Sequence, residues 1–232
     1  MLFVCSALVF YTGSGLCQHE HGHDSEHQKK ESTEHQHEKQ HEHSNYLESE
    51  RQRYMWQEPQ RVMNEIGVKP DMVIGDVGAG EGYFTLRLAE RVGDKGRVYS
   101  NEIDKKQLTL IEVRCEEAGL GNVTTILGTG DAPGFPPGEL DMIFLVNTYH
   151  LFEDPVTFLE NTKKGLKPEG ELVIIQWESE KMALEFPDMP HAERVKYSKK
   201  PLLDNIQAAG YKMVREETFL SQQNIYICRP GD

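Results

Sequence analysis

A glycine-rich segment at residues 76–82, Asp-Val-Gly-Ala-Gly-Glu-Gly, sets the narrowest limits on how this chain can fold. It follows a short apolar run at residues 72–74 and precedes a segment in which Phe84, Leu88 and Val92 recur at helical spacing. Glycines at a strand-to-helix junction let backbone N–H groups approach a small ligand, because no Cβ atom stands in the way. The segment therefore predicts a ligand site at the carboxyl end of a strand.

Strand-like and helical patterns alternate along most of the remaining chain, and this alternation favours a parallel sheet with right-handed crossovers. We expect strands at residues 72–76, 97–101, 123–127, 140–146 and 171–176, and helices at residues 83–92, 105–118, 155–166 and 201–209. Two final strand-like runs, at residues 211–219 and 224–228, are joined by a turn so short that they must pair antiparallel. The predicted fold class is α/β: a doubly wound, Rossmann-like, seven-stranded sheet that is mostly parallel, with a C-terminal antiparallel strand.

The first part of the chain, residues 1–17, is an apolar, signal-like segment that contains Cys5 and Cys17. Its apolar run at residues 2–10 is too short to span a bilayer but has the length of a signal-peptide core. No Lys or Arg precedes this run, and no Ala-x-Ala cleavage site follows it. The segment predicts an exported protein or a membrane tether through the N-terminus, with a cytoplasmic location as the alternative.

Residues 18–44 form a His/Glu-rich linker with almost no apolar side chain. Such a composition cannot bury enough surface to offset the entropy of ordering, so disorder is expected. Weak binding of divalent metal and a merely solvated linker are equally good interpretations of its histidines, but catalysis needs a fixed geometry that this tract does not offer. The histidines are His19, His21, His23, His27, His35, His37, His41 and His43.

The folded domain is expected to occupy residues 45–232, with a helical lead-in in which Pro59 marks a helix start. An insertion at about residues 177–200 breaks the alternation and should lie over the binding edge of the sheet. A chain of 232 residues with 38% hydrophobic content can bury the core of one such domain. Its net charge of −13 argues against a nucleic-acid partner, whose phosphates it would repel.

The spacing of the glycines distinguishes between two ligands. Dinucleotide sites favour G-x-G-x-x-G, whereas this turn is G-x-G-x-G and Tyr83 stands at the position of the last glycine. The pattern D-x-G-x-G-x-G, an acid at Glu102 that ends the second strand, and the closing antiparallel pair resemble the class I S-adenosylmethionine-dependent methyltransferases. The resemblance covers roughly residues 68–229. It extends to a group of small bacterial methyltransferases that carry segments such as GDVGAGEGYFT, GRVYSNEID, LVNTYHLFEDP and LKPEGELVIIQW, and whose acceptors are mostly unassigned.

The resemblance implies that the glycine turn binds the cofactor S-adenosylmethionine. Gly78, Ala79 and Gly80 would bring backbone close to its aminoacyl and ribose parts, and Gly82 would let the helix start close to the sheet. Asp76 would orient the loop and accept a hydrogen bond from the cofactor's ammonium group, directly or through water.

Three further residues are candidates for the nucleoside part of the cofactor. Glu102 lies about twenty residues beyond the turn, where a carboxylate can accept bonds from both ribose hydroxyls, and the alternative is a solvated surface acid. The resemblance implies that Ile103 packs on one adenine face. Asp131 would accept a bond from the adenine amino group, although Asp before Ala-Pro is also ordinary turn chemistry.

The segment after the fourth strand is the candidate catalytic edge. Asn147 is expected to contact the cofactor, and His150 is a candidate general base because imidazole titrates near neutrality. A packed or hydrogen-bonded His150 is an equal alternative. Tyr149 would act beside it or line the pocket, and His191 in the insertion is a weaker candidate.

These observations predict an enzyme that transfers a methyl group from S-adenosylmethionine to an unidentified small-molecule acceptor. The alternatives are an NAD(P)-dependent oxidoreductase and an exported metal-binding protein with a non-catalytic Rossmann-like domain. No metal site is expected in the core. Methylation of a thiophilic substrate such as arsenite is disfavoured, because Cys115 and Cys228 fall on different elements and cannot supply several convergent thiolates.

Overall fold

The computed structural model describes residues 48–231, and its contacts divide the chain into Met1–Ser49 and Glu50–Asp232. The signal-like segment at residues 1–17 and the His/Glu-rich linker at residues 18–44 lie outside the described residues. Among the residues that the structure describes, no helix is long and apolar enough to cross a membrane.

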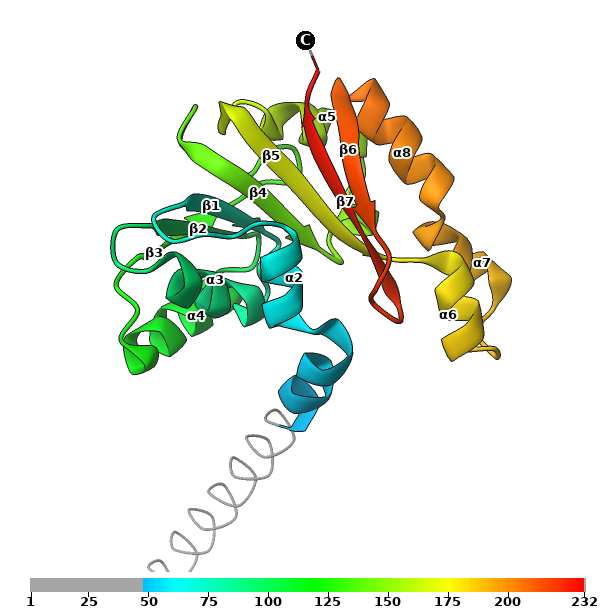
Figure 1. Cartoon of the computed structure of the whole chain (residues 1–232), viewed down its shortest axis with the longest axis horizontal. Helices are drawn as coiled ribbons and strands as arrows, with labels where there is room; N and C mark the ends of the chain where they lie inside the picture. The colour runs from blue at the N-terminus through cyan, green and yellow to red at the C-terminus, as the bar shows by residue number, and fades with distance from the viewer. Residues whose placement is uncertain (1–47, 232) are drawn as a thin grey trace, which may run out of the picture. The chain divides into compact units, whose positions relative to one another are not determined.

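Within the described part of the chain, seven strands form one sheet in the order β3-β2-β1-β4-β5-β7-β6 (Figure 1). Strands β1 to β5 pair parallel, whereas β7 runs antiparallel to both of its neighbours, β5 and β6. The strands are β1 (Val73–Val77), β2 (Arg97–Glu102), β3 (Val123–Leu127), β4 (Leu140–Val146), β5 (Leu166–Trp177), β6 (Tyr211–Glu217) and β7 (Gln223–Pro230). The predicted fold class, with its terminal antiparallel strand, is confirmed.

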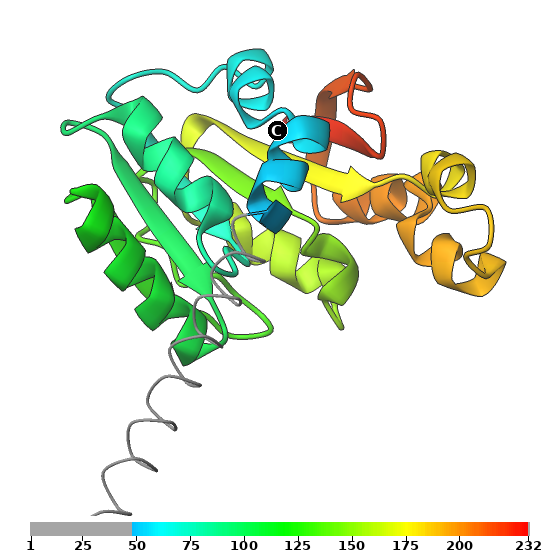
Figure 2. The same cartoon turned by 90° about the horizontal axis from the view of Figure 1, so that it is seen from below.

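Helices cover both faces of the sheet, which is why its central strands are apolar along most of their length (Figures 1 and 2). One core lies between the sheet and α2 and α3, with α4 beside α3, and a second core lies under α5 and α8. The longer helices are α2 (Pro59–Glu65), α3 (Tyr83–Val92), α4 (Lys105–Ala118), α5 (Pro155–Thr162) and α8 (Lys199–Ala208). Residues 48–57 are also helical.

The ends of α4 illustrate how local sequence sets an element. Asp104 caps the first turn, where its side chain accepts a 2.8 Å hydrogen bond from Lys106 N. Gly119 follows the last residue at φ 69°, a left-handed conformation that costs glycine little. The helix occupies the predicted residues 105–118 as a result.

One element ends earlier than the periodicity predicts. The helix expected at residues 155–166 stops at Thr162, and Leu166 already belongs to β5, where it pairs with Leu140 of β4. Gly165 O accepts a 2.9 Å bond from Leu140 N, so the backbone after the helix is used by the sheet. The strand expected at residues 171–176 is correspondingly longer. Apolar spacing had continued the helix because Leu166 is buried in either arrangement.

Residues between β5 and α8 form two short helices, α6 (Ser179–Glu185) and α7 (His191–Arg194), and the 3₁₀ turn η2 (Val195–Tyr197). Lys181 fixes α6 to the turn between β6 and β7: its Nζ donates to the backbone oxygens of Thr218, Leu220 and Gln223 at 2.7–2.9 Å. Trp177, at the end of β5, stacks on Trp56 with ring centroids 5.1 Å apart. The inserted segment is thereby attached to the turn between β6 and β7, and Trp177 at its start is attached to the helical residues 48–57.

Candidate active site

The glycine turn follows β1 and adopts backbone conformations that favour glycine. Gly78, Gly80 and Gly82 have φ of 64°, 55° and 81°. A Cβ atom at Gly78 would approach Thr148 Oγ1 to 2.5 Å, so the turn packs against the segment after β4. A Cβ at Gly80 would meet nothing within 4 Å. The turn is therefore closed by protein at Gly78 and faces open space at Gly80.

Glu102, at the end of β2, is bonded to this turn. Its Oε2 accepts a 3.0 Å hydrogen bond from Gly80 N, and its Oε1 accepts from Ile103 N at 2.7 Å and Asp104 N at 3.3 Å. Ala79 N also donates to Asn101 O, at 3.0 Å. A carboxylate has about four lone-pair directions, so after these three bonds Glu102 keeps about one, on Oε2, for a further donor. The following side chain, Ile103, is 69% exposed.

Asp76 lies beneath the turn and is buried. Thr85 Oγ1, in the first turn of α3, donates a 2.7 Å bond to its Oδ2, and Ser100 Oγ lies 3.0 Å from the same hydroxyl. Burial raises the pKa of Asp76 from its ordinary 3.8 to about 6, against the Thr85 bond and the charge of Arg53, which lower it. The structure thus places Asp76 where it holds β1 and α3 together.

Asp131 lies after β3 in a tight turn at residues 128–132. Thr129 N donates to Ala132 O at 3.2 Å, and Asn161 Nδ2 donates to the backbone oxygen of Asp131 at 2.9 Å. The Asp131 residue itself is exposed. Its position is compatible with both interpretations, a ligand contact and a turn residue.

The segment after β4 packs against the glycine turn at Thr148, where the strand order reverses between β1 and β4. Asn147 has a φ of 55°, which is unusual for a residue other than glycine, and its Oδ1 accepts a 2.7 Å bond from Gln223 Nε2. Thr148 Oγ1 donates toward Val146 O at 3.1 Å and Val77 O at 3.3 Å. These bonds join the segment after β4 to the end of β1 and to the first residue of β7.

The two candidate catalytic side chains differ in their surroundings. Tyr149 is buried in the core under α5 and α8, and its hydroxyl accepts a 2.7 Å bond from Asn205 Nδ2. Burial raises its pKa. His150 is half-buried, with its Nδ1 3.1 Å from Gln176 Nε2 and its ring edge against Tyr197, centroids 5.0 Å apart. Burial lowers the pKa of His150 below its ordinary 6.5, and Lys196 adds to this effect, while the bond to Gln176 opposes it.

Comparison with known proteins decides the family. A family model described as a methyltransferase domain matches residues 68–218, more than half of the chain. The chain belongs to this methyltransferase family. A structure of an S-adenosylmethionine-dependent methyltransferase from Aquifex aeolicus is 28% identical, with a TM-score of 0.69, and the match covers 76% of this chain and 91% of that one. The predictions of family, fold and cofactor are confirmed.

Two curated methyltransferases match a shorter region of this methyltransferase domain. Nocamycin O-methyltransferase of Saccharothrix syringae is 32% identical over 104 residues, 45% of this chain and 37% of the relative. The ubiquinone/menaquinone biosynthesis C-methyltransferase UbiE of Shewanella sp. (strain ANA-3) is 27% identical over 112 residues, 48% of this chain and 45% of the relative. The chain thus spans less than half the length of these relatives. The oxidoreductase and metal-protein alternatives find no support in these similarities.

The geometry of this methyltransferase domain fits S-adenosylmethionine. The space beside Gly80 is open, the Glu102 carboxylate bonds Gly80 N and keeps an acceptor position on the same oxygen, and Ile103 presents an exposed apolar surface next to Glu102. The described residues contain no group of three or more side chains that could hold a metal ion. Cys115 and Cys228 are buried on α4 and β7, and burial raises the pKa of both thiols, that of Cys228 to about 12.

Several residues of the site escaped the sequence analysis. Thr85 and Thr148 bond the turn and its neighbours, and Gln176 bonds His150. Gln176 precedes the last residue of β5, so attention to every carboxyl strand end would have found it. Thr148 lies within the segment already considered, but its role depends on contact with Gly78, which only the folded structure shows.

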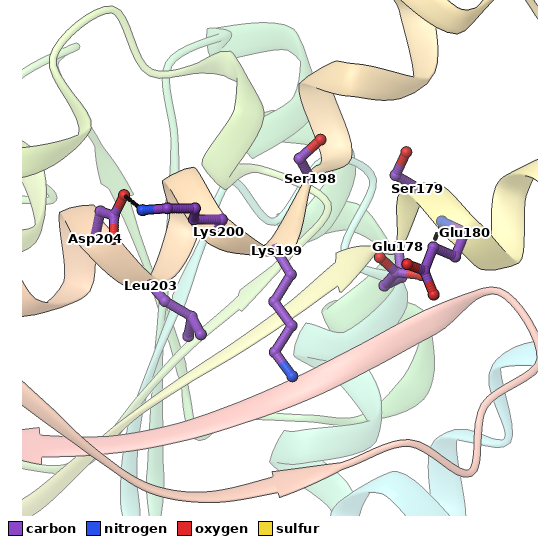
Figure 3. Close-up of a pocket in the computed structure, with 8 residues that line it drawn as sticks. All are labelled: Glu178, Ser179, Glu180, Ser198, Lys199, Lys200, Leu203 and Asp204. Atoms are coloured by element: carbon purple, nitrogen blue, oxygen red, sulfur yellow. Dashed lines mark hydrogen bonds and ion pairs between the residues drawn. The ribbon is translucent and has the colours of Figure 1, made fainter.

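A cavity of about 460 Å³ lies between the starts of α6 and α8 (Figure 3). Most of its charged side chains have partners: Lys199 Nζ lies 2.6 Å from Glu216 Oε2, and Lys200 Nζ lies 2.6 Å from Asp204 Oδ2. Glu178 accepts bonds from two backbone N–H groups of α6. Because these charges are already satisfied, we assign the cavity no ligand. Its lining residues are Glu178, Ser179, Glu180, Ser198, Lys199, Lys200, Leu203 and Asp204.

Proposed function

We propose that this protein transfers a methyl group from S-adenosylmethionine to a small-molecule acceptor that enters beside the inserted segment at residues 177–200. One observation carries the proposal: the Glu102 carboxylate, at the end of β2, lies 3.0 Å from Gly80 N in the turn after β1. This joins the hydroxyl-binding acid and the close-approach glycine of the predicted cofactor site. When bound, S-adenosylmethionine supplies an electrophilic methyl carbon on a sulfonium.

The residues of the chain then bind and orient. Glu102 accepts the ribose hydroxyls, Ile103 packs on the adenine, and Asp131 accepts from the adenine amino group. The backbone at residues 78–80 lies against the aminoacyl and ribose parts, while Asp76 stabilises the turn and attracts the ammonium group. Asn147, held by Gln223, contacts the cofactor from the end of β4.

Proton handling falls to His150 in this proposal. Its lowered pKa keeps the imidazole neutral near pH 7, as a general base requires. His150 Nδ1 lies 3.1 Å from Gln176 Nε2 and 3.5 Å from Gln176 Oε1. Proton uptake at Nε2 requires the tautomer that carries its proton on Nδ1 and donates it to Gln176 Oε1. Tyr149 is buried and bonded to Asn205, so it positions the segment rather than contacting the acceptor.

Aromatic side chains border the proposed acceptor entrance. Tyr197 packs on His150, and Trp177 stacks on Trp56. This lining excludes water from the transferring group and favours an acceptor with an apolar or aromatic body. The net charge of −13 disfavours a polyanionic acceptor such as nucleic acid.

Calorimetry with the full chain tests the cofactor part of the proposal. We expect micromolar binding of S-adenosylmethionine and S-adenosylhomocysteine, and a loss of at least tenfold in affinity for Glu102→Gln, which keeps the shape but removes the charge. Glu90→Ala, an exposed acid on α3, is the control and should bind as the wild type does. Absence of binding to the wild type would refute the proposal. A fluorescence titration in which NADH binds and S-adenosylmethionine does not would refute it as well.

The acceptor is accessible through a metabolite screen that follows release of S-adenosylhomocysteine. Extract fractions that give turnover with the wild type but not with Glu102→Gln contain the acceptor. Fractions that contain apolar and aromatic compounds should release S-adenosylhomocysteine. Turnover confined to nucleic-acid fractions would contradict the proposed acceptor class.

A further inference from the structure

Arg53, in the helical segment at residues 48–57, lacks a counter-ion in the part of the chain that the structure describes. Its guanidinium stacks on Tyr83, 4.0 Å from the ring centroid, and its Nε donates a 2.6 Å bond to Gln57 Oε1. No carboxylate within residues 48–231 forms an ion pair with it at 4.0 Å or less. Its terminal nitrogens thus remain available to an anion.

A neighbouring arginine on the same ring is satisfied. Arg87 lies 3.9 Å from the Tyr83 centroid, and its Nη2 lies 3.6 Å from Glu50 Oε2. Glu50 also binds Arg114 Nη2, at 2.7 Å. Two arginines therefore pack against one tyrosine, but among residues 48–231 only Arg87 has a carboxylate within ion-pair distance, and the charge of Glu50 acts on Arg53 from a longer range.

The surroundings of Arg53 make its missing counter-ion significant. Burial lowers its pKa, because removing a guanidinium from water is costly unless an anion compensates. Asp76 is close enough to affect this pKa, yet it is not in contact with the guanidinium. Tyr83, beneath Arg53, is the first residue of α3 and directly follows Gly82 of the glycine turn. Arg53 and Asp76, which is bonded to Thr85, thus lie beside the same turn without an ion pair to any residue that the structure describes.

We propose that Arg53 binds the α-carboxylate of the methionyl part of S-adenosylmethionine. The inference rests on the proposed function, because it assigns a contact at the same cofactor site. An amino-acid zwitterion suits the two charges: its ammonium is attracted by Asp76 and its carboxylate by Arg53. The planar guanidinium fork can donate two parallel bonds to a carboxylate, and Gln57 fixes its orientation through Nε.

Binding of two ligands that differ only in the carboxylate tests this contact. S-adenosylhomocysteine carries it, and the decarboxylated analogue, S-adenosyl-3-thiopropylamine, keeps the ammonium but lacks it. We expect the wild type to prefer S-adenosylhomocysteine by about tenfold to a hundredfold, the range for a bond between charged groups. In Arg53→Met this preference should vanish, with affinity for the analogue unchanged. No acceptor is present, so an acceptor carboxylate cannot produce the effect.

Arg87→Met is the matched control, since Arg87 contacts the same ring but already has Glu50, and it should keep the preference. Arg53→Lys keeps the charge and most of the packing, so it should retain part of the preference for S-adenosylhomocysteine. It replaces Arg53→Met as the test variant if the Met variant folds poorly. A preference that persists in both Arg53 variants would overturn the inference, as would an equal loss of affinity for both ligands. If the wild type binds neither ligand, the proposed function fails first; if it binds both equally, only the Arg53 contact fails.

Discussion

Gln57 Nε2 donates a 2.9 Å hydrogen bond to Gln223 Oε1, joining the helix before the domain core to the first residue of its last strand. Both side chains are fully buried. Gln223 Nε2 in turn donates to Asn147 Oδ1 at 2.7 Å, and Gln57 Oε1 accepts from Arg53 Nε. The chain of amides thus connects Arg53 to the candidate catalytic edge, and each link uses a buried polar group that has little access to water.

Removing a link from this network should destabilise the fold. Gln223→Leu leaves the Gln57 donor and the Asn147 acceptor without partners, so we expect the free energy of unfolding to fall by about 2 kcal/mol. Gln57→Leu should cost a similar amount. The double variant should cost less than the sum, because the second substitution removes a group that the first had already left unpaired.

Urea titrations of the single and double variants measure this coupling. Gln207→Leu, an exposed position on α8, is the control and should change stability by less than about 0.5 kcal/mol. Additive losses from Gln57→Leu and Gln223→Leu would show that the two amides do not act together.

Three glycine variants separate strain from ligand contact. Gly80 and Gly119 both have positive φ and open space at the Cβ position, so Ala at either should cost about 1 kcal/mol of stability. Only Gly80→Ala should also weaken binding of S-adenosylhomocysteine, since Gly119 lies at the end of α4. Gly78→Ala should destabilise more than either, because its Cβ would collide with Thr148.

Thermal unfolding and calorimetry on the same samples check this set. Equal binding by Gly80→Ala and Gly119→Ala would mean that the space beside Gly80 is not used by the cofactor.

Asp76 should make stability depend on pH in an unusual direction. Burial raises its pKa to about 6 in the folded protein, against 3.8 ordinarily, so the folded state holds this proton more tightly. The resulting stabilisation is complete below 3.8 and is lost as the pH rises through about 6. The difference corresponds to about 3 kcal/mol.

Asp76→Asn removes this dependence because the amide does not ionise. Its stability relative to the wild type should therefore improve by up to about 3 kcal/mol between about pH 4 and pH 8. Urea titrations at these two pH values measure the change. A relative stability that stays constant, or that declines toward high pH, would contradict the buried, proton-retaining carboxyl.

His150 should control the acid side of the pH–rate profile once an acceptor is known. Its pKa lies below 6.5, so methyl transfer should be nearly independent of pH near 7 and should decline only as the pH falls below that value. His150→Gln should lower the rate and abolish this decline. A variant that is slower but keeps the wild-type profile would identify His150 as a packing residue.

Lys181 should hold the inserted segment in place. Lys181→Met leaves three backbone oxygens near the turn between β6 and β7 without their shared donor, and we expect a loss of about 2 kcal/mol in stability. Lys200→Met removes only an exposed pair with Asp204 and should cost less than about 0.5 kcal/mol. Equal effects in urea titrations would show that the three backbone bonds of the half-buried Lys181 add nothing to stability.

Local signals in the sequence were sufficient for most elements. The spans of α3 and α4 were predicted as observed, because Gly82 and Gly93 delimit one and Asp104 and Gly119 the other. The glycine turn and Glu102 were recognisable for the same reason: their roles follow from a strand, a turn and the next strand end, all within about thirty residues. The predicted end of α5 was wrong, because the observed end depends on the pairing of Leu166 with Leu140.

Contacts between distant parts of the chain were decided only by folding. Gln57 and Gln223 are 166 residues apart, and no sequence pattern links them. In the sequence, Arg53 cannot be distinguished from the other charged residues of its helix. Packing from several elements at once decides whether the Arg53 guanidinium has a counter-ion and whether Thr148 packs against Gly78. It also decides whether burial shifts the pKa of Asp76. Sequence could indicate the cofactor because its binding turn is a local structure. The environment of each polar side chain is not local, and it required the tertiary structure.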